Sequence, residues 1–116
     1  MDRLVLSIAE DYTMTPGARL RKNGEFSGEE FLETKLVPAF RNAQKESKKL
    51  LVDLDGCFGF LLSFIDEAFG RLTYIFGKAD VNKILEVKCN DEVSIIDAVN
   101  TAIDEWEIKR KNEGSC

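Results

Sequence analysis

The residues best suited to chemistry lie in one stretch, LLVDLDGCFGFLLSFIDEAFGRL, which runs from Leu50 to Leu72. Asp53 and Asp55 follow an apolar run of strand length and precede a glycine. Carboxylates at this position could serve a metal ion or a small ligand, because ligands collect at the carboxyl ends of parallel strands. Ser63 stands at the start of a helical pattern, where a hydroxyl can accept a phosphoryl group. The stretch is therefore a candidate for a catalytic pair, for a modifiable serine, or for a strand, loop and helix only.

The segment LLVDLDGC resembles the phosphatase signature of the haloacid-dehalogenase superfamily, an apolar strand followed by DxDG and a hydroxyl residue. The resemblance implies that Asp53 attacks phosphorus and that Asp55 acts as acid and base beside magnesium. Three features disagree: a full helix precedes the motif, Cys57 replaces the hydroxyl residue, and no acidic pair follows a third strand. We interpret the two aspartates as ending a strand and opening a turn. An enzyme or small-ligand site at Asp53, Asp55 and Ser63 stays as the alternative.

The composition disfavours other function classes. The chain has no histidine and therefore no Ser–His or Cys–His pair, and its cysteines (Cys57, Cys89 and Cys116) form no zinc pattern. A net charge of −5 argues against nucleic-acid binding. We expect Cys57 and Cys89 in or near the core and Cys116 in an exposed tail. We also expect no cofactor, no metal, no secretory signal, no membrane segment and a cytoplasmic location.

The amino-terminal quarter predicts a strand and a short hairpin. Residues 3–9, RLVLSIA, alternate in a way that is typical of a strand with one well-buried face. The pair Asn23 and Gly24 favours a tight turn, so residues 18–21 and 25–26 are expected to form a small ribbon.

A helix is predicted to follow Ser27. Ser27 and Glu30 fit a capping box, in which each side chain satisfies a backbone N–H of the other's residue. An apolar stripe then continues to about Ser47. Pro38 interrupts the stripe, so we expect a kinked helix or two segments that meet near Val37.

The carboxyl-terminal half predicts two strands and two helices. Residues 49–55 are almost continuously apolar, as in a central strand covered on both faces. A helix from Ser63 to Gly77 and a strand at 83–89 follow. Asp91 is predicted to cap a last helix, and residues 110–116 to form a frayed polar tail. The inner side of that helix is expected to carry Val93, Ile95, Ile96, Val99, Ile103 and Trp106.

The order of these elements predicts a single domain over residues 1–116. Strands that alternate with helices favour an α/β fold, and here we expect a single-layer, mostly parallel sheet of about four to five strands packed with helices.

Four segments carry a family resemblance: TPGARLRKNGEFSGEEF, LVPAF, LLVDLDG and, most specifically, LSFIDEAFGRL. With these segments the chain resembles, from Leu4 to about Ile108, a bacterial and archaeal STAS-like family of unknown function. That family is related to the sulfate-transporter and anti-sigma-factor-antagonist domain. The resemblance implies a STAS-like fold and a protein partner, since relatives in the larger superfamily bind ATPases of the histidine-kinase type.

The resemblance also gives Ser63 a second interpretation. Antagonists carry a DLSG segment and then an apolar residue followed by D-S-S-G. DLDG at 53–56 matches the first part, and Ser63 falls on the serine that the antagonists' kinase phosphorylates. Leu61, Leu62 and Phe64 replace the other positions of that turn, which makes it apolar and suits a docking edge. From spacing alone, Ser63 is also expected to be the N-cap of its helix, with Asp66 at the third position.

The leading hypothesis is a non-enzymatic, antagonist-like interaction module with no cofactor. It binds a protein partner, for which a histidine-kinase-like ATPase is the candidate, through the loop and helix start at 56–67, with Ser63 as a candidate phosphosite. Aromatic residues are enriched at such interfaces. Predicted partner contacts are apolar at Phe58, Phe60 and Phe64 and polar at Asp66, Glu67 and Arg71. The alternative is that the aromatic residues are buried in the core and the charged residues form a solvated helix face.

Overall fold

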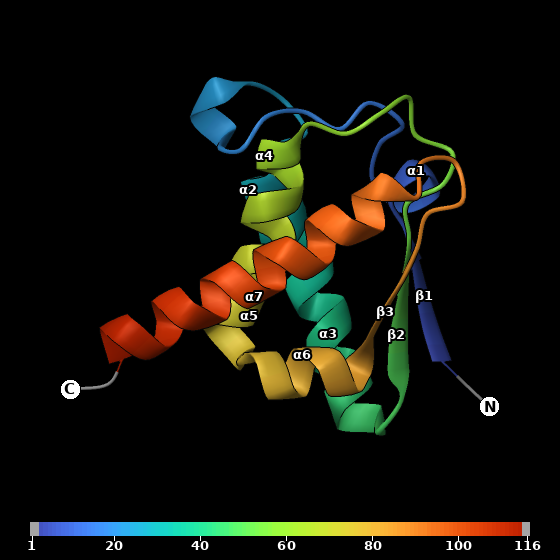
Figure 1. Cartoon of the computed structure of the whole chain (residues 1–116). Coiled ribbons are helices and arrows are strands. Elements are labelled where there is room, and N and C mark those ends of the chain that lie inside the picture. The colour runs from blue at the N-terminus through green and yellow to red at the C-terminus, as the bar shows by residue number, and fades with distance from the viewer. Residues whose placement is uncertain (1–2, 115–116) are drawn as a thin grey trace.

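The computed structural model describes residues 3–114 and contains one parallel sheet with helices packed on one side (Figure 1). The strands β1 (Arg3–Ser7), β2 (Lys49–Asp53) and β3 (Leu85–Lys88) lie in the order β1-β2-β3, and both pairings are parallel. The predicted parallel α/β architecture is confirmed. The expected four to five strands are not found, because the sheet within residues 3–114 has three.

The predicted hairpin is wrong, although its turn is present. Residues Arg21–Asn23 form the short 3-10 helix η1, followed by Gly24 at φ 142°. Backbone bonds tie the arms of this loop at Gly17–Phe26 (2.8 Å) and Gly28–Ala18 (2.9 Å). Because Phe26 adopts a positive φ of 54°, the second arm leaves the extended conformation that a ladder requires.

A continuous helical segment connects β1 to β2, made of α2 (Gly28–Phe31), the π-helical turn η2 (Leu32–Leu36) and α3 (Val37–Glu46). The expected junction near Val37 is confirmed. Pro38 lies just after the π turn, whose wider backbone accommodates a residue that has no N–H to donate.

Of the two hydrogen bonds in the predicted capping box, this segment forms only the one accepted by Ser27. Ser27 Oγ accepts from Glu30 N at 3.0 Å. The Glu30 carboxylate accepts from the hydroxyl of Tyr12 and so does not reach back to Ser27. Burial and this hydrogen bond raise the pKa of Tyr12 above its ordinary value.

A second helical segment consists of α4 (Leu62–Ile65), the π-helical turn η3 (Asp66–Gly70) and α5 (Arg71–Phe76). Gly77 ends it at φ 90°, as predicted, and also begins α6 (Lys78–Ile84), a helix that the sequence patterns did not predict. Because α6 takes Ile84, the strand predicted at 83–89 shortens to β3.

The last helix, α7 (Ser94–Gly114), is longer than predicted. Residues 110–114 are helical where a frayed tail was expected, and positions 115 and 116, including Cys116, lie outside the described residues. Val93 precedes the helix and is 66% exposed, so it is not on the inner side. The inner side does contain Ile95, Val99, Ile103 and Trp106, all buried.

The core lies between the sheet and the helices, and only one face of the sheet contributes to it. Leu50 and Val52 of β2 are fully buried, whereas Leu51 is half-buried on the opposite face, so the expected cover on both faces is wrong. Strand order explains this. Two right-handed crossovers that advance in the same direction place their helices on the same side of the sheet.

Two glycines allow the helices to approach closely. A Cβ at Gly28 would lie 2.7 Å from the carbonyl oxygen of Phe64, and one at Gly70 would overlap the Trp106 ring. Both glycines lie in the segments that carry the family resemblance, FSGEEF and FGRL. Backbone packing is therefore one function of these segments.

Gly70→Ala is expected to lower the free energy of unfolding by about 1–3 kcal/mol, because the added methyl overlaps the buried indole. Urea denaturation measures the change. Gly114→Ala is the control, since a Cβ there meets nothing within 4 Å. Equal effects of the two substitutions would contradict the proposed close packing.

Candidate functional site

The aspartates after β2 organise a turn between two loops. Asp53 Oδ1 accepts from Asp55 N at 2.9 Å, and Asp55 Oδ1 accepts from Asp91 N at 2.8 Å. Asp91 Oδ2 in turn accepts from Gly56 N at 3.0 Å. Lys88 Nζ lies 3.9 Å and 4.0 Å from the carboxylates of Asp53 and Asp55. These contacts support the interpretation that the two aspartates shape the turn.

This network corrects one expectation about α7. Asp91 was predicted to cap that helix, but the helix begins at Ser94 and the Asp91 carboxylate is bound to Gly56. Among residues 3–114, no three His, Cys, Asp or Glu side chains are grouped so that they could hold a metal ion.

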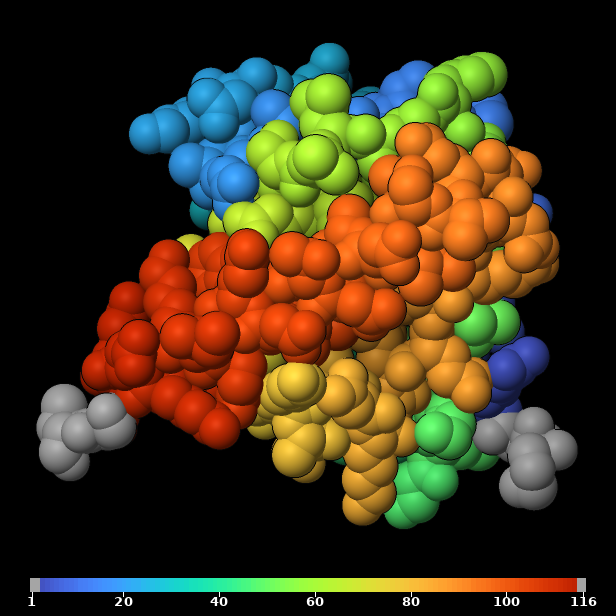
Figure 2. Space-filling model, viewed as in Figure 1, coloured from blue at the N-terminus to red at the C-terminus, as the bar shows by residue number. Residues whose placement is uncertain are grey.

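The loop that follows, residues 56–62, is hereafter the apolar loop. Phe58 N donates to Met14 O at 2.9 Å, and Cys57 Sγ donates to Thr13 O at 3.6 Å, so the loop is fixed to the segment after α1 (Ile8–Asp11). Three of its apolar side chains nevertheless face solvent: Phe58 is 83% exposed, Leu61 55% and Leu62 68%. Figure 2 shows this part of the chain, in yellow-green, standing at the surface beside the orange start of α7.

Ser63 does not cap its helix. The N-cap is Leu61, whose extended backbone (φ −81°, ψ 140°) carries no side-chain acceptor, and Ser63 lies inside the first turn. Its side chain is half-buried and lines a groove of about 530 Å³ between α4 and α7. The other lining residues are Arg19, Leu62, Asp66, Ala98, Thr101, Ala102 and Glu105.

The three aromatic residues predicted to touch a partner lie at different depths. Phe58 is exposed, Phe60 is half-buried, and Phe64 is fully buried. Phe64 stacks on Phe31 at a ring distance of 5.7 Å, and Phe60 packs against Phe64 at 5.9 Å. The prediction for Phe64 is therefore wrong, because the helix directs this side chain toward α2 and not toward solvent.

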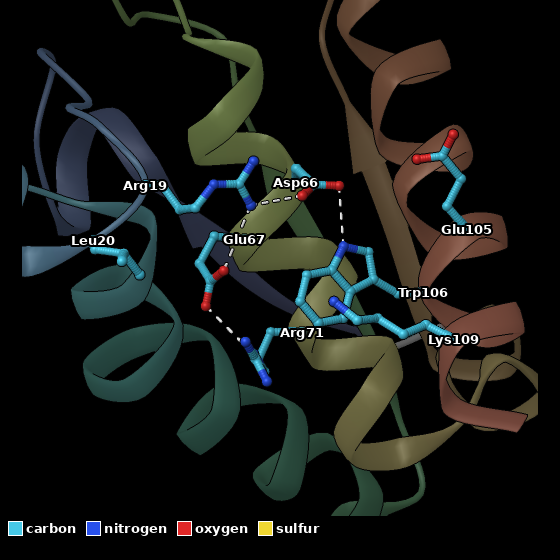
Figure 3. A pocket seen from close by; sticks show the side chains of 8 residues that line it. All are labelled: Arg19, Leu20, Asp66, Glu67, Arg71, Glu105, Trp106 and Lys109. Atoms are coloured by element: carbon cyan, nitrogen blue, oxygen red, sulfur yellow. Dashed lines mark hydrogen bonds and ion pairs between the residues drawn. The ribbon is translucent and has the colours of Figure 1, made fainter. Parts of the chain in front are cut away.

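The charged residues of this helix are joined in one network, which lines an open pocket (Figure 3). Asp66 Oδ2 lies 2.7 Å from Arg19 Nη1, and Asp66 Oδ1 accepts from Trp106 Nε1 at 3.0 Å. Glu67, only 5% exposed, has one oxygen 3.6 Å from Arg19 Nη1 and the other 3.3 Å from Arg71 Nε. Glu67 is therefore too buried for the expected polar rim, whereas the side chains of Asp66 and Arg71 are 30% and 41% exposed and line a surface pocket.

Two cations lie against the Trp106 indole. The Arg71 guanidinium carbon is 4.6 Å from the ring centroid and Lys109 Nζ is 4.4 Å from it, distances at which a cation is attracted to the ring. Sequence reasoning did not identify Arg19 as a partner of Asp66 and Glu67, or Trp106 as a partner of Asp66. The one available signal was the single tryptophan of the chain on a helix otherwise rich in charge.

Comparison with known protein families identifies the family to which this chain belongs. Residues 27–94, more than half of the chain, match the model of the STAS-like domain of unknown function. The chain belongs to this family. No curated protein and no solved structure matches it. The match to the STAS-like family extends from Ser27 to Ser94 and includes Asp66, Glu67 and Gly70, whereas Arg19 and Trp106 lie outside the matched range.

Within residues 3–114, no helix combines the length and the hydropathy that a bilayer span requires.

Glu67→Ala is expected to lower the free energy of unfolding by about 2–3 kcal/mol, because it leaves two guanidinium groups without their buried carboxylate. Glu105→Ala, an exposed substitution on α7, should change stability by less than about 0.5 kcal/mol. Thermal or urea unfolding distinguishes them. A loss no larger for Glu67→Ala than for Glu105→Ala would show that the network contributes nothing to folding.

The free energy of unfolding is expected to fall as the pH rises above the ordinary pKa of a cysteine thiol, which is about 9. Burial raises the pKa of Cys57 to about 11, so between the two pKa values the unfolded chain binds fewer protons than the folded chain, and unfolding is favoured. Unfolding free energies measured from pH 8 to 11 should decline less steeply in Cys57→Ala. Parallel declines in both proteins would contradict this assignment.

Proposed function

We propose that this STAS-like domain is a non-enzymatic protein-interaction module, which docks a partner on the apolar loop and the adjoining first turns of the helix at 62–67. One observation carries the proposal. Phe58, Leu61 and Leu62 are 55–83% exposed on a loop whose backbone is already tied to Met14 and to Asp91. A contact surface that is ordered before binding loses less conformational entropy on association.

The partner is inferred from the family resemblance. Antagonist domains of the larger superfamily bind ATPases of the histidine-kinase type, and the apolar loop occupies the corresponding strand-to-helix connection. We therefore propose such an ATPase as the partner. Large aromatic side chains such as Phe58 are the residues expected to dominate the binding energy.

Ser63 is the proposed switch. Its half-buried hydroxyl lies at the boundary between the apolar loop and the groove that Arg19 and Asp66 line. Phosphorylation would add nearly two negative charges. The helix N-terminus would favour them, whereas Asp66 would oppose them. A partner that docks apolar side chains on Leu61 and Leu62 would then meet a strongly hydrated group, so binding should weaken.

The test measures binding of a purified histidine-kinase-type ATPase from the same genome, with and without nucleotide, by isothermal titration calorimetry. The wild-type chain should bind, and Phe58→Ser with Leu62→Ser should weaken binding by about 10-fold or more. Ser63→Asp should weaken it and Ser63→Ala should not. Ile108→Ser is the matched control, because Ile108 is 61% exposed on α7 away from the loop.

Circular dichroism first confirms that each variant is folded. If no ATPase binds, or if Ile108→Ser is as damaging as the loop variants, the proposed function is wrong.

A further inference from the structure

Three loops meet at the carboxyl edge of the sheet, around part of the apolar loop. They follow β1, β2 and β3, whose last residues Ser7, Asp53 and Lys88 are aligned in register. A Cβ on Gly56 would lie 3.1 Å from Ala9 Cβ, and the Gly56 amide is bound to Asp91. Figure 1 shows α1 and the loops after β2 and β3 gathered at one end of the strands.

This edge combines exposed apolar side chains with an excess of carboxylates. The apolar side chains are Phe58 at 83%, Val93 at 66% and Met14 at 53% exposure. Segments 8–14, 53–58 and 88–93 contain six acidic residues and one basic residue, Lys88. The acidic residues are Glu10, Asp11, Asp53, Asp55, Asp91 and Glu92. We call the six carboxylates and the three apolar side chains the carboxyl-edge surface.

The charge of this surface is not neutralised within the described chain. Lys88 lies between Asp53 and Asp55, which are the least exposed of the six. Glu10, Asp11, Asp91 and Glu92 are exposed, and no ion pair joins any of them to a basic side chain of residues 3–114. The basic residues Lys48, Lys49 and Lys83 lie at the opposite, amino end of the strands and beside a separate groove.

We infer that the partner presents a basic segment with apolar side chains to the carboxyl-edge surface. The inference rests on the proposed function, in which the apolar loop binds a protein, and it names the chemistry of that protein's contact. Complementary charge would steer the encounter and fix the register, and apolar contacts with Phe58, Val93 and Met14 would supply the buried area.

Other occupants fit this surface less well. Phosphate groups of a nucleic acid or of an anionic membrane would be repelled by the exposed carboxylates. A second copy in a twofold contact would place the same acidic residues against each other, since each residue then faces its own surface patch. A head-to-tail contact with the basic amino edge of another copy is a distinct arrangement, and self-association detects it.

The experiment uses a fluorescent helical peptide of leucine and lysine, about 14 residues long, with lysine on one face, and its leucine–glutamate analogue. Fluorescence anisotropy should show binding of the lysine peptide alone, with affinity that falls as salt rises from about 0.05 to 0.5 M. Amide shifts in NMR spectra should map the contact to residues 10–14, 55–58 and 91–93.

The decisive variants reverse charge at two exposed positions outside the hydrogen bonds that join Asp53, Asp55, Gly56 and Asp91; of the two, Glu92 accepts one long bond from Ser94 Oγ at 3.4 Å. Glu10→Lys with Glu92→Lys should weaken peptide binding by about 10-fold at low salt. Glu46→Lys with Asp80→Lys makes the same change in net charge at the amino end of the sheet, and affinity should stay within about 2-fold. Analytical ultracentrifugation of the wild-type chain is expected to show no self-association through this surface.

Each of the following results would overturn the inference: no binding of the lysine peptide, equal binding of the glutamate analogue, equal effects of the two charge-reversed pairs, or self-association abolished by Glu10→Lys with Glu92→Lys. The proposed function fails independently, when no ATPase binds. An ATPase that binds through Phe58 with no dependence on salt would leave the proposed function standing and refute the basic contact.

Discussion

The contact between Trp106 and the helix at 62–76 determines where the rest of the surface lies. The indole occupies the space that a side chain at Gly70 would need, and its Nε1 donates to Asp66 at 3.0 Å. This pair of contacts fixes both the distance and the direction of α7 across the helix. Because α7 begins next to the apolar loop, its position also forms the groove beside Ser63 and brings Val93 to the carboxyl edge.

The charged network around this contact stabilises one arrangement of the loop at 17–20, the helix at 62–76 and α7. A carboxylate as buried as Glu67 is costly unless its charge is compensated, and here Arg19 comes from the loop before α2 and Arg71 from the same helix. A shift of any segment would leave a buried charge with fewer partners. The network therefore favours a single geometry, and it holds the loop at 17–20 near the groove.

Patterns in the sequence predicted what depends on local chemistry. The helix predicted from Ser63 to Gly77 and the junction predicted near Val37 are both found, because each follows from backbone preference or from one apolar helical face. The parallel α/β class followed from the order of elements. The same patterns did not predict α6, since Gly77 ends one helix and begins the next, and the predicted helix end concealed the start that follows it.

What escaped prediction depends on contacts between distant residues. Ser63 has the usual character of an N-cap, yet with Phe64 and Ile65 buried the N-cap is Leu61 and the helix begins at Leu62. No spacing rule relates Arg19 to Asp66 or Asp66 to Trp106, so the network that joins these residues was not predicted. Asp91 does not cap α7, because its carboxylate accepts from the amide of Gly56. These two residues are 35 positions apart, and they lie within hydrogen-bonding distance only in the folded chain.

The π-helical turn at Asp66–Gly70 has a consequence for how this family can change in length. Such a turn holds one residue more than a regular turn, and each residue of an α-helix rotates the following side chains by about 100°. Losing a single residue between 66 and 70 would relax the turn to ordinary α geometry. The part of the helix that carries Leu62 and Ser63 would then rotate about the helix axis relative to the part that packs on α7. Insertions and deletions here therefore change the direction in which Leu62 and Ser63 point more than they change the length of the helix.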